Sequence, residues 1–150
     1  MIARELLDTA PIPGGGELRL FRRELKGADE YSIMLGRIEL MNSRLSGSEE
    51  ALATLTCAGL AVKNPRLLVG GYGMGFTLRA ALSVLPPQAH VEVAELIPAI
   101  VQWARGPMAS LSQDSLDDSR VALTIGDVCD VIAKADRDYD AILLDVDNGP

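Results

Sequence analysis

The stretch LLVGGYGMGFTLRAAL, from Leu67 to Leu82, decides the fold. The apolar run at its start is typical of a buried strand, and the segment after the glycines is typical of a helix. Glycine permits positive φ and lets a ligand approach the main chain, while the N-terminus of the following helix offers unpaired N–H groups. Gly71, Gly73 and Gly75 lie at this turn. They predict either a ligand held against bare backbone or a tight turn with a purely structural purpose.

Strand and helix alternate from this stretch toward the C-terminus. Pro86-Pro87 and Gly106-Pro107 separate successive segments, and a polar loop rich in Ser and Asp follows the second pair. The expected strands cover 66–70, 90–96, 120–127 and 139–146, and the expected helices cover 75–85, 98–105 and 128–135. Such alternation predicts right-handed βαβ crossovers. The expected fold class is therefore α/β, with a Rossmann-like, mostly parallel sheet and flanking helices.

A small antiparallel β unit is predicted before this sheet, at residues 17–41. Residues 10–17 form a Pro/Gly loop, after which ELRLFRREL, EYSIML and IELM alternate in polarity as half-buried strands do. A helix is expected over 46–60, because Ser46 and Glu49 have the spacing of a capping box and Gly59 marks an end.

Composition and charge exclude several classes of protein. The chain carries a formal charge of −7, which repels a phosphate backbone, so nucleic acid is not an expected partner. No apolar run reaches the roughly 18 residues of a membrane span, and the polar N-terminus is unlike a secretory signal, so we expect a cytoplasmic protein without a membrane partner. Cys57 and Cys129 lack metal-binding spacing, and both are expected to be buried; no metal site is predicted.

Acidic residues follow three of the expected strands. Glu95 comes 24 positions after Gly71, where a carboxylate can accept the two hydroxyls of a ribose; the alternative is a solvated acid at a helix N-terminus. Glu92, three residues earlier, is expected to face an edge or solvent. Asp127 is placed to meet an exocyclic amine such as that of adenine, or to cap the helix over 128–135, and the two roles are compatible.

The fourth strand also ends in polar residues. Asp145, Asp147 and Asn148 come at its carboxyl end. An acid there can attract a cationic substrate or act as a general base toward an amine. Ordinary turn chemistry is the alternative.

Together, LLVGGYGMGFTLRAAL, VEVAELIPAIVQWA, IGDV and YDAILLDVDNGP resemble the class I S-adenosylmethionine-dependent methyltransferase fold. Within it the chain is similar to the spermidine synthase-like branch, the polyamine aminopropyltransferases, over about residues 17–150. The resemblance implies S-adenosylmethionine or its decarboxylated form as cofactor, and a small amine as acceptor of an aminopropyl or methyl group. Acidic clefts attract polyamines, and the net charge agrees with that.

The resemblance also implies roles for particular residues. Glu39 stands where the family commonly has a glutamine facing the cofactor, and Asp145 would be the acid near the reacting amine. The implied cofactor-binding residues are Gly71, Gly73 and Gly75 for the methionine-derived part, Glu95 for ribose, Ile97 for packing on the nucleoside and Asp127 for adenine.

Two departures concern the amino group of the cofactor. The aminopropyltransferases carry GGGDGG, whose Asp is replaced here by Gly73 or Met74, depending on alignment. Many methyltransferases have an acid two residues before the first glycine of GxGxG, where this chain has Val69. Cofactor binding is therefore better supported than either transfer reaction. A non-catalytic nucleoside-binding protein is the alternative, and an NAD-dependent dehydrogenase is a weaker one because its glycine spacing is GxGxxG.

The expected organisation is two domains. Residues 1–45 form an N-terminal segment with the small β unit, and residues 46–150 form a Rossmann-like nucleoside-binding domain that is incomplete at its C-terminus. The family continues beyond the fourth strand, and AILLDV would be an apolar strand short of neighbours. We expect a longer protein or a homo-oligomer to cover it, and favour the former.

Overall fold

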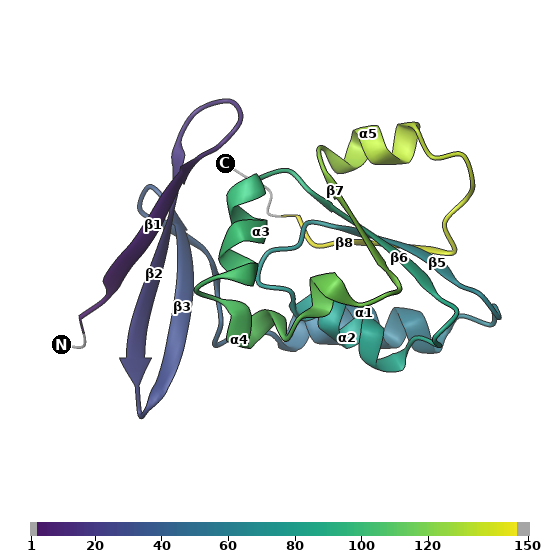
Figure 1. Cartoon of the computed structure of the whole chain (residues 1–150), viewed down its shortest axis with the longest axis horizontal. Coiled ribbons are helices and arrows are strands. Elements are labelled where there is room, and N and C mark those ends of the chain that lie inside the picture. The colour runs from purple at the N-terminus through teal and green to yellow at the C-terminus, as the bar shows by residue number, and fades with distance from the viewer. Residues whose placement is uncertain (1–2, 147–150) are drawn as a thin grey trace. The chain divides into compact units, whose positions relative to one another are not determined.

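The computed structural model describes residues 3–146, and the chain divides into two compact units, Met1–Leu45 and Ser46–Pro150. The first unit is an antiparallel sheet, and the second is a parallel sheet with helices (Figure 1). The predicted α/β fold class is confirmed, including the antiparallel β unit that precedes the parallel sheet.

The N-terminal sheet has the strand order β1-β2-β3-β4, and all neighbours are antiparallel. Its strands are β1 (Glu5–Pro11), β2 (Glu17–Leu25), β3 (Ala28–Leu35) and β4 (Ile38–Asn42). Lys26 and Gly27 join β2 to β3 with positive φ values of +54° and +80°, as a type I′ hairpin turn requires. As the alternation predicted, one face of β2 and β3 is buried. It carries Leu18, Leu20, Tyr31 and Ile33.

Strand β1 was not predicted from the sequence. Ala10 and Pro11, which were assigned to a loop, are its last two residues, so the loop is limited to residues 12–16. The strand lies at the edge of the sheet, and most of its side chains are exposed. An edge strand that buries little has no alternating apolar pattern, which is why the sequence gives no signal for it.

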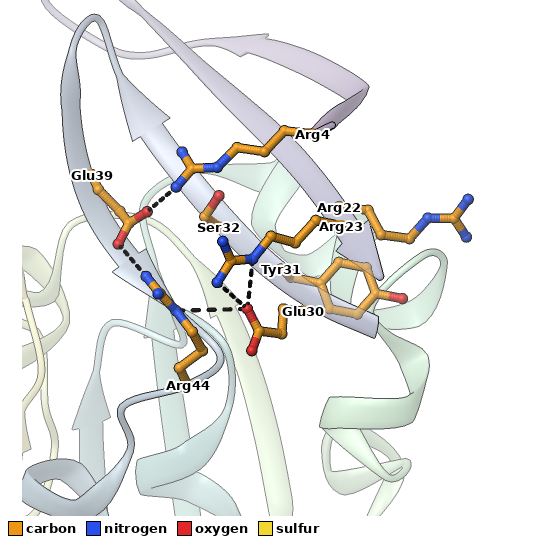
Figure 2. A pocket seen from close by; sticks show the side chains of 8 residues that line it. All are labelled: Arg4, Arg22, Arg23, Glu30, Tyr31, Ser32, Glu39 and Arg44. Atoms are coloured by element: carbon orange, nitrogen blue, oxygen red, sulfur yellow. Dashed lines mark hydrogen bonds and ion pairs between the residues drawn. The ribbon is translucent and has the colours of Figure 1, made fainter. Parts of the chain in front are cut away.

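The other face of the N-terminal sheet carries a chain of ion pairs (Figure 2). Arg23 donates to Glu30 from Nε at 2.7 Å and lies 2.6 Å from it through Nη2. Arg44 lies 3.8 Å from Glu30 and 3.3 Å from Glu39, and Arg4 lies 3.5 Å from Glu39. The cavity between them measures about 10 Å³, space for about one water molecule. Because Arg23 and Glu30 face each other across β2 and β3, their pair supports this register.

The parallel sheet has the strand order β7-β6-β5-β8. Its strands are β5 (Arg66–Gly70), β6 (His90–Glu95), β7 (Val121–Ile125) and β8 (Ala141–Leu144). The helices are α1 (Gly47–Ala58), α2 (Phe76–Val84), α3 (Pro98–Arg105), α4 (Ala109–Ser112) and α5 (Val128–Ala133), with a 3-10 turn, η1, at Ser115–Asp117. Figure 1 shows α1 and α2 on one side of this sheet and α5 on the other. Residues 67–70 are all buried, which explains the unbroken apolar run of the central strand β5.

Three local predictions need correction. The polar loop before β7 contains α4 and η1, which are too short for a helical period to show. Ser46 precedes α1, but its hydroxyl donates to Glu50 at 2.7 Å instead of capping the backbone, so the capping box does not form. Cys57 is buried as expected, whereas Cys129 is exposed because it lies in the first turn of α5, away from the core.

Arg120 connects the C-terminal end of α2 to the segment before β7 through hydrogen bonds. Its Nη1 donates to the carbonyls of Leu82 and Leu85 at 3.0 and 2.9 Å, and its Nε and Nη2 donate to the Asp118 carboxylate at 2.9 and 2.8 Å. The hydrogen bonds that the Arg120 side chain and backbone N–H donate to Asp118 lower the pKa of its carboxyl to about 2. The guanidinium therefore satisfies carbonyls that α2 leaves open at its C-terminus.

We expect Asp118→Asn to lower the free energy of unfolding by about 1–2 kcal/mol at neutral pH. A carboxyl whose pKa is lowered by folding stabilises the fold fully above its unfolded value near 4, and this stabilisation disappears as the pH falls toward 2. The difference between variant and unaltered chain in urea unfolding should therefore shrink between pH 5 and pH 2. Asp117→Asn is the control, because Asp117 is mostly exposed and should change stability little. A difference that stays constant with pH would contradict the assignment.

Candidate active site

The candidate site lies at the carboxyl edge of the parallel sheet, where the strand order reverses. From the central strand β5 the chain proceeds to β6 and β7 on one side, and it returns to β8 on the other side. Because the strands are parallel, the segments that follow them all meet at one edge (Figure 1). Ligands of open α/β sheets bind in the crevice outside this edge, at the point of reversal. That point lies between β5 and β8.

Contacts within the chain already require glycine at two positions of the turn after β5. Gly71, Gly73 and Gly75 have φ values of +85°, +57° and +84°, which favour glycine. A Cβ at Gly71 would overlap the backbone carbonyl of Asp145, and one at Gly75 would lie 2.5 Å from the hydroxyl oxygen of Tyr72. Gly71 and Gly75 are therefore required by the packing of the turn, with or without a ligand.

Tyr72, inside this turn, is a residue that the sequence analysis did not single out. Its side chain is buried, and its hydroxyl lies 3.5 Å from Ser115 Oγ in η1. Burial raises the pKa of the Tyr72 phenol. The ring fills the space beside Gly75 and so supports the turn from within. A large aromatic side chain among glycines was the available signal in the sequence.

Glu95, at the end of β6, joins the glycine turn to the start of α3. Its Oε2 accepts a hydrogen bond from the Tyr72 backbone N–H at 2.8 Å, and its Oε1 accepts one from the Ile97 N–H at 2.9 Å. The side chain is only 6% exposed, so the alternative of a solvated acid is wrong. Each carboxylate oxygen can accept a second hydrogen bond, and the residue keeps the capacity to bind hydroxyl groups.

The two neighbouring predicted residues differ in their surroundings. Ile97 is half-buried at the N-terminus of α3, where Pro98 occupies the first turn. Asp127 is exposed and caps α5, with Oδ1 accepting from the Cys129 N–H at 2.7 Å. The capping role of Asp127 is confirmed, and its role toward an adenine stays a prediction.

Asp145 follows β8 and lies beside the glycine turn. Its backbone N–H donates to the Gly70 carbonyl at 2.8 Å, and its Oδ2 accepts a hydrogen bond from the hydroxyl of Thr77 at 2.9 Å. Burial raises the pKa of the Asp145 carboxyl; the Thr77 hydrogen bond opposes that shift, and the charge of Glu49 adds to it. A half-buried carboxyl with a raised pKa suits proton transfer. Asp147 and Asn148 lie outside the described residues.

The structure thus brings Glu95 and Asp145 to the glycine turn, from opposite sides of β5. Asp127 follows β7, the edge strand beyond β6, and its carboxylate is engaged by α5. Glu39 lies in the N-terminal unit, where it pairs with Arg4 and Arg44.

Glu92 does not face an edge or solvent as expected. Its carboxylate accepts hydrogen bonds from Thr124 at 3.2 Å and from the Tyr139 hydroxyl at 2.6 Å, and Arg66 lies 3.9 Å away. Arg66 also stacks on the Tyr139 ring at 4.2 Å. Glu92 therefore belongs to a polar cluster that links Tyr139, just before β8, to strands β6 and β7.

Residues 3–146 hold no group of three or more His, Cys, Asp or Glu arranged to bind a metal ion. Among the same residues, no helix has the length and apolar character needed to cross a membrane.

Relatives and solved structures agree with this architecture. No protein-family profile matches the chain. The polyamine aminopropyltransferase of Sulfolobus acidocaldarius is 31% identical over 88 residues, which cover 58% of this chain and 29% of the relative. Polyamine aminopropyltransferase 1 of Streptomyces coelicolor is 33% identical over 94 residues, which cover 61% of this chain and 18% of the relative. The matched segment thus spans less than a third of either relative.

Two solved structures share the fold over nearly the whole chain. Spermidine synthase from Thermotoga maritima gives a TM-score of 0.74 at 17% identity, covering 97% of this chain and 48% of that chain. A spermidine synthase in complex with the transition state analogue AdoDATO gives 0.73 at 20% identity, covering 93% and 47%. The chain therefore shares the fold of the spermidine synthases. The curated relatives carry the same likeness at the level of sequence, so the chain is similar to polyamine aminopropyltransferases in sequence and to spermidine synthases in fold.

Proposed function

We propose that the chain binds decarboxylated S-adenosylmethionine, or S-adenosylmethionine itself, and transfers an aminopropyl or methyl group to an amine. Residues 46–150 would form the nucleoside-binding domain. The observation that carries the proposal is the buried carboxylate of Glu95, which lies at a strand end beside the glycine turn and the start of α3. A carboxylate in this position is suited to the hydroxyls of a ribose.

The residues that would hold the donor are those at the reversal of the strand order. Gly73 has positive φ, and its place in the turn would face the methionine-derived part. Ile97 would pack on the nucleoside, and the exposed Asp127 would meet the adenine amine. The donor supplies a sulfonium leaving group, so the protein needs only to position the acceptor and take up its proton.

Asp145 would accept the proton of the attacking amine. Its half-burial and raised pKa favour proton uptake, and its negative charge attracts a protonated amine before transfer. The similar proteins are polyamine aminopropyltransferases and a spermidine synthase, which supports an aminopropyl group as the one transferred. The acidic balance of the chain agrees with a polyamine acceptor.

One observation favours a second candidate, a nucleoside-binding protein without catalysis. Gly73 or Met74 replaces the aspartate of the aminopropyltransferase glycine motif, so this turn offers no carboxylate to anchor an amino group. Glu95 would serve nucleoside binding in either case. Both candidate functions therefore predict binding of the nucleoside donor, and only the transferase predicts turnover of that donor.

Turnover of decarboxylated S-adenosylmethionine with putrescine, followed by mass spectrometry, separates the candidates. We expect an aminopropylated product, and S-adenosylmethionine in place of the decarboxylated donor tests methyl transfer. Asp145→Asn should lower kcat about a hundredfold to a thousandfold and change donor affinity little, because general-base catalysis contributes that much. Asp136→Asn is the control, since Asp136 is an exposed carboxylate outside the site. Saturable binding without any product would leave the nucleoside-binding protein as the function.

A further inference from the structure

Thr77, in the first turn of α2, places its hydroxyl on Asp145 across 68 positions of sequence. Its side chain is buried, at 1% exposure, and its Oγ1 donates to Asp145 Oδ2 at 2.9 Å. A buried threonine early in a helix often satisfies its hydroxyl with a nearby carbonyl of its own chain segment. Here the Thr77 hydroxyl instead donates to the Asp145 carboxylate, which follows β8.

Asp145 is fixed at three points around this contact. Its N–H is bound to the Gly70 carbonyl, its own carbonyl lies against Gly71, and Thr77 holds Oδ2. Within residues 3–146, Oδ1 of Asp145 receives no hydrogen bond. Among the described residues, one oxygen of the carboxylate is therefore anchored, and the other accepts no hydrogen bond.

We propose that Thr77 is a positioning residue for the transfer reaction: it holds the Asp145 carboxylate by one oxygen so that the other accepts the proton of the acceptor amine. This inference rests on the proposed function for its link to turnover. The hydrogen bond itself belongs to the protein without substrate, and its effect on Asp145 can be measured there.

The charged and polar groups around Asp145 set the direction of the effect. Glu49 on α1 disfavours the ionised carboxylate, as burial does, and Thr77 on α2 favours it. Removing the Thr77 hydroxyl therefore raises the pKa of Asp145 further. A general base must be ionised, so the acidic limb of the rate profile moves to higher pH when the hydroxyl is lost.

The test compares Thr77→Val, which keeps the shape and loses the hydroxyl, with Thr77→Ser, which keeps the hydroxyl. The pH titration of the Asp145 side-chain carboxyl is followed by carbon-13 NMR in the chain without substrate. We expect the midpoint in Thr77→Val to rise by about one pH unit, a tenfold change in proton affinity, because a hydrogen bond to a charged group has about that strength. Thr77→Ser should stay close to the unaltered chain. Equal midpoints in all three would overturn the inference.

If the Thr77→Val variant does not fold, a second measurement on the unaltered chain tests the same contact. In the unaltered chain, the hydroxyl proton of Thr77 should exchange slowly with water while Asp145 is ionised and faster once Asp145 is protonated. Fast exchange at every pH would also overturn the inference.

Kinetics then link the contact to turnover. Thr77→Val should shift the acidic limb of kcat to higher pH by the same interval as the NMR midpoint, so that kcat falls about tenfold at a pH below that limb while KM stays nearly unchanged. If the unaltered chain shows no turnover, the proposed function fails while the NMR result still decides the contact. An NMR shift without a matching kinetic shift in an active chain would contradict the role in positioning.

Discussion

Replacing Glu95 by alanine is expected to lower the free energy of unfolding by about 3 kcal/mol and to weaken donor binding about a hundredfold or more. The stability loss follows because the Tyr72 and Ile97 N–H groups both lose a charged acceptor in a buried place. The affinity loss follows because the ribose hydroxyls would lose the same carboxylate. Urea unfolding measures the first effect, and calorimetric titration with decarboxylated S-adenosylmethionine measures the second.

Two further variants separate structure from binding. Glu95→Gln keeps one acceptor oxygen and should lie between the alanine variant and the unaltered chain in both measurements. Glu92→Ala removes a half-buried carboxylate from the same strand, where it binds Thr124 and Tyr139, so it should reduce stability without reducing affinity. An unchanged affinity in a folded Glu95→Ala protein would show that the carboxylate does not hold the donor.

Gly71→Ala is expected to cost about 3–5 kcal/mol of unfolding free energy, or to prevent folding of the parallel sheet. Its φ of +85° disfavours any side chain, and a Cβ there would overlap the Asp145 carbonyl, so β5 and β8 would have to separate. Urea unfolding, monitored by the fluorescence of the buried Trp103, measures the loss.

Gly14→Ala is a matched control for backbone strain. Gly14 has a φ of +88°, and nothing lies within 4 Å of an added Cβ. Gly14→Ala should therefore lower the free energy of unfolding by only about 1–2 kcal/mol, because alanine must adopt the left-handed conformation there. Similar losses at the two positions would mean that the contact between Gly71 and Asp145 adds nothing.

The parallel sheet could be predicted because local signals agree there. Residues 67–70 are apolar without a break and are buried, Gly75 caps the start of α2, and Pro98 begins α3. Successive strands in such a pattern can form only a few topologies, and their carboxyl ends then meet at one edge. Glu95 and Asp145 were singled out for this reason, since Glu95 is the last residue of β6 and Asp145 directly follows β8.

Elements without a periodic apolar pattern could not be predicted in this way. Strand β1 is exposed along most of its length, and α4 and η1 are shorter than the pattern that identifies a helix. Pairing with β2 stabilises β1, and that pairing depends on contacts between segments distant in sequence.

The connections within the site are also long-range. Thr77 meets Asp145 only because α2 and β8 pack around β5, and Tyr72 meets Glu95 only because β6 lies beside β5. Sequence spacing places each residue at an edge or on a helix, and it does not state which side chain donates to which. The anchoring of Glu95 by two backbone N–H groups therefore required coordinates.

The central claim is that an adenosine group binds beside Glu95 at the reversal of the strand order. The most direct measurement is a titration of the chain with methylthioadenosine, followed in proton–nitrogen NMR spectra. We expect saturable shifts at the amides of Tyr72 and Ile97, the two that donate to Glu95, and little change at Arg66 and His90, the first residues of β5 and β6 at the opposite edge of the sheet. Shifts that do not saturate, or a saturable response that leaves both amides unmoved, would contradict the account.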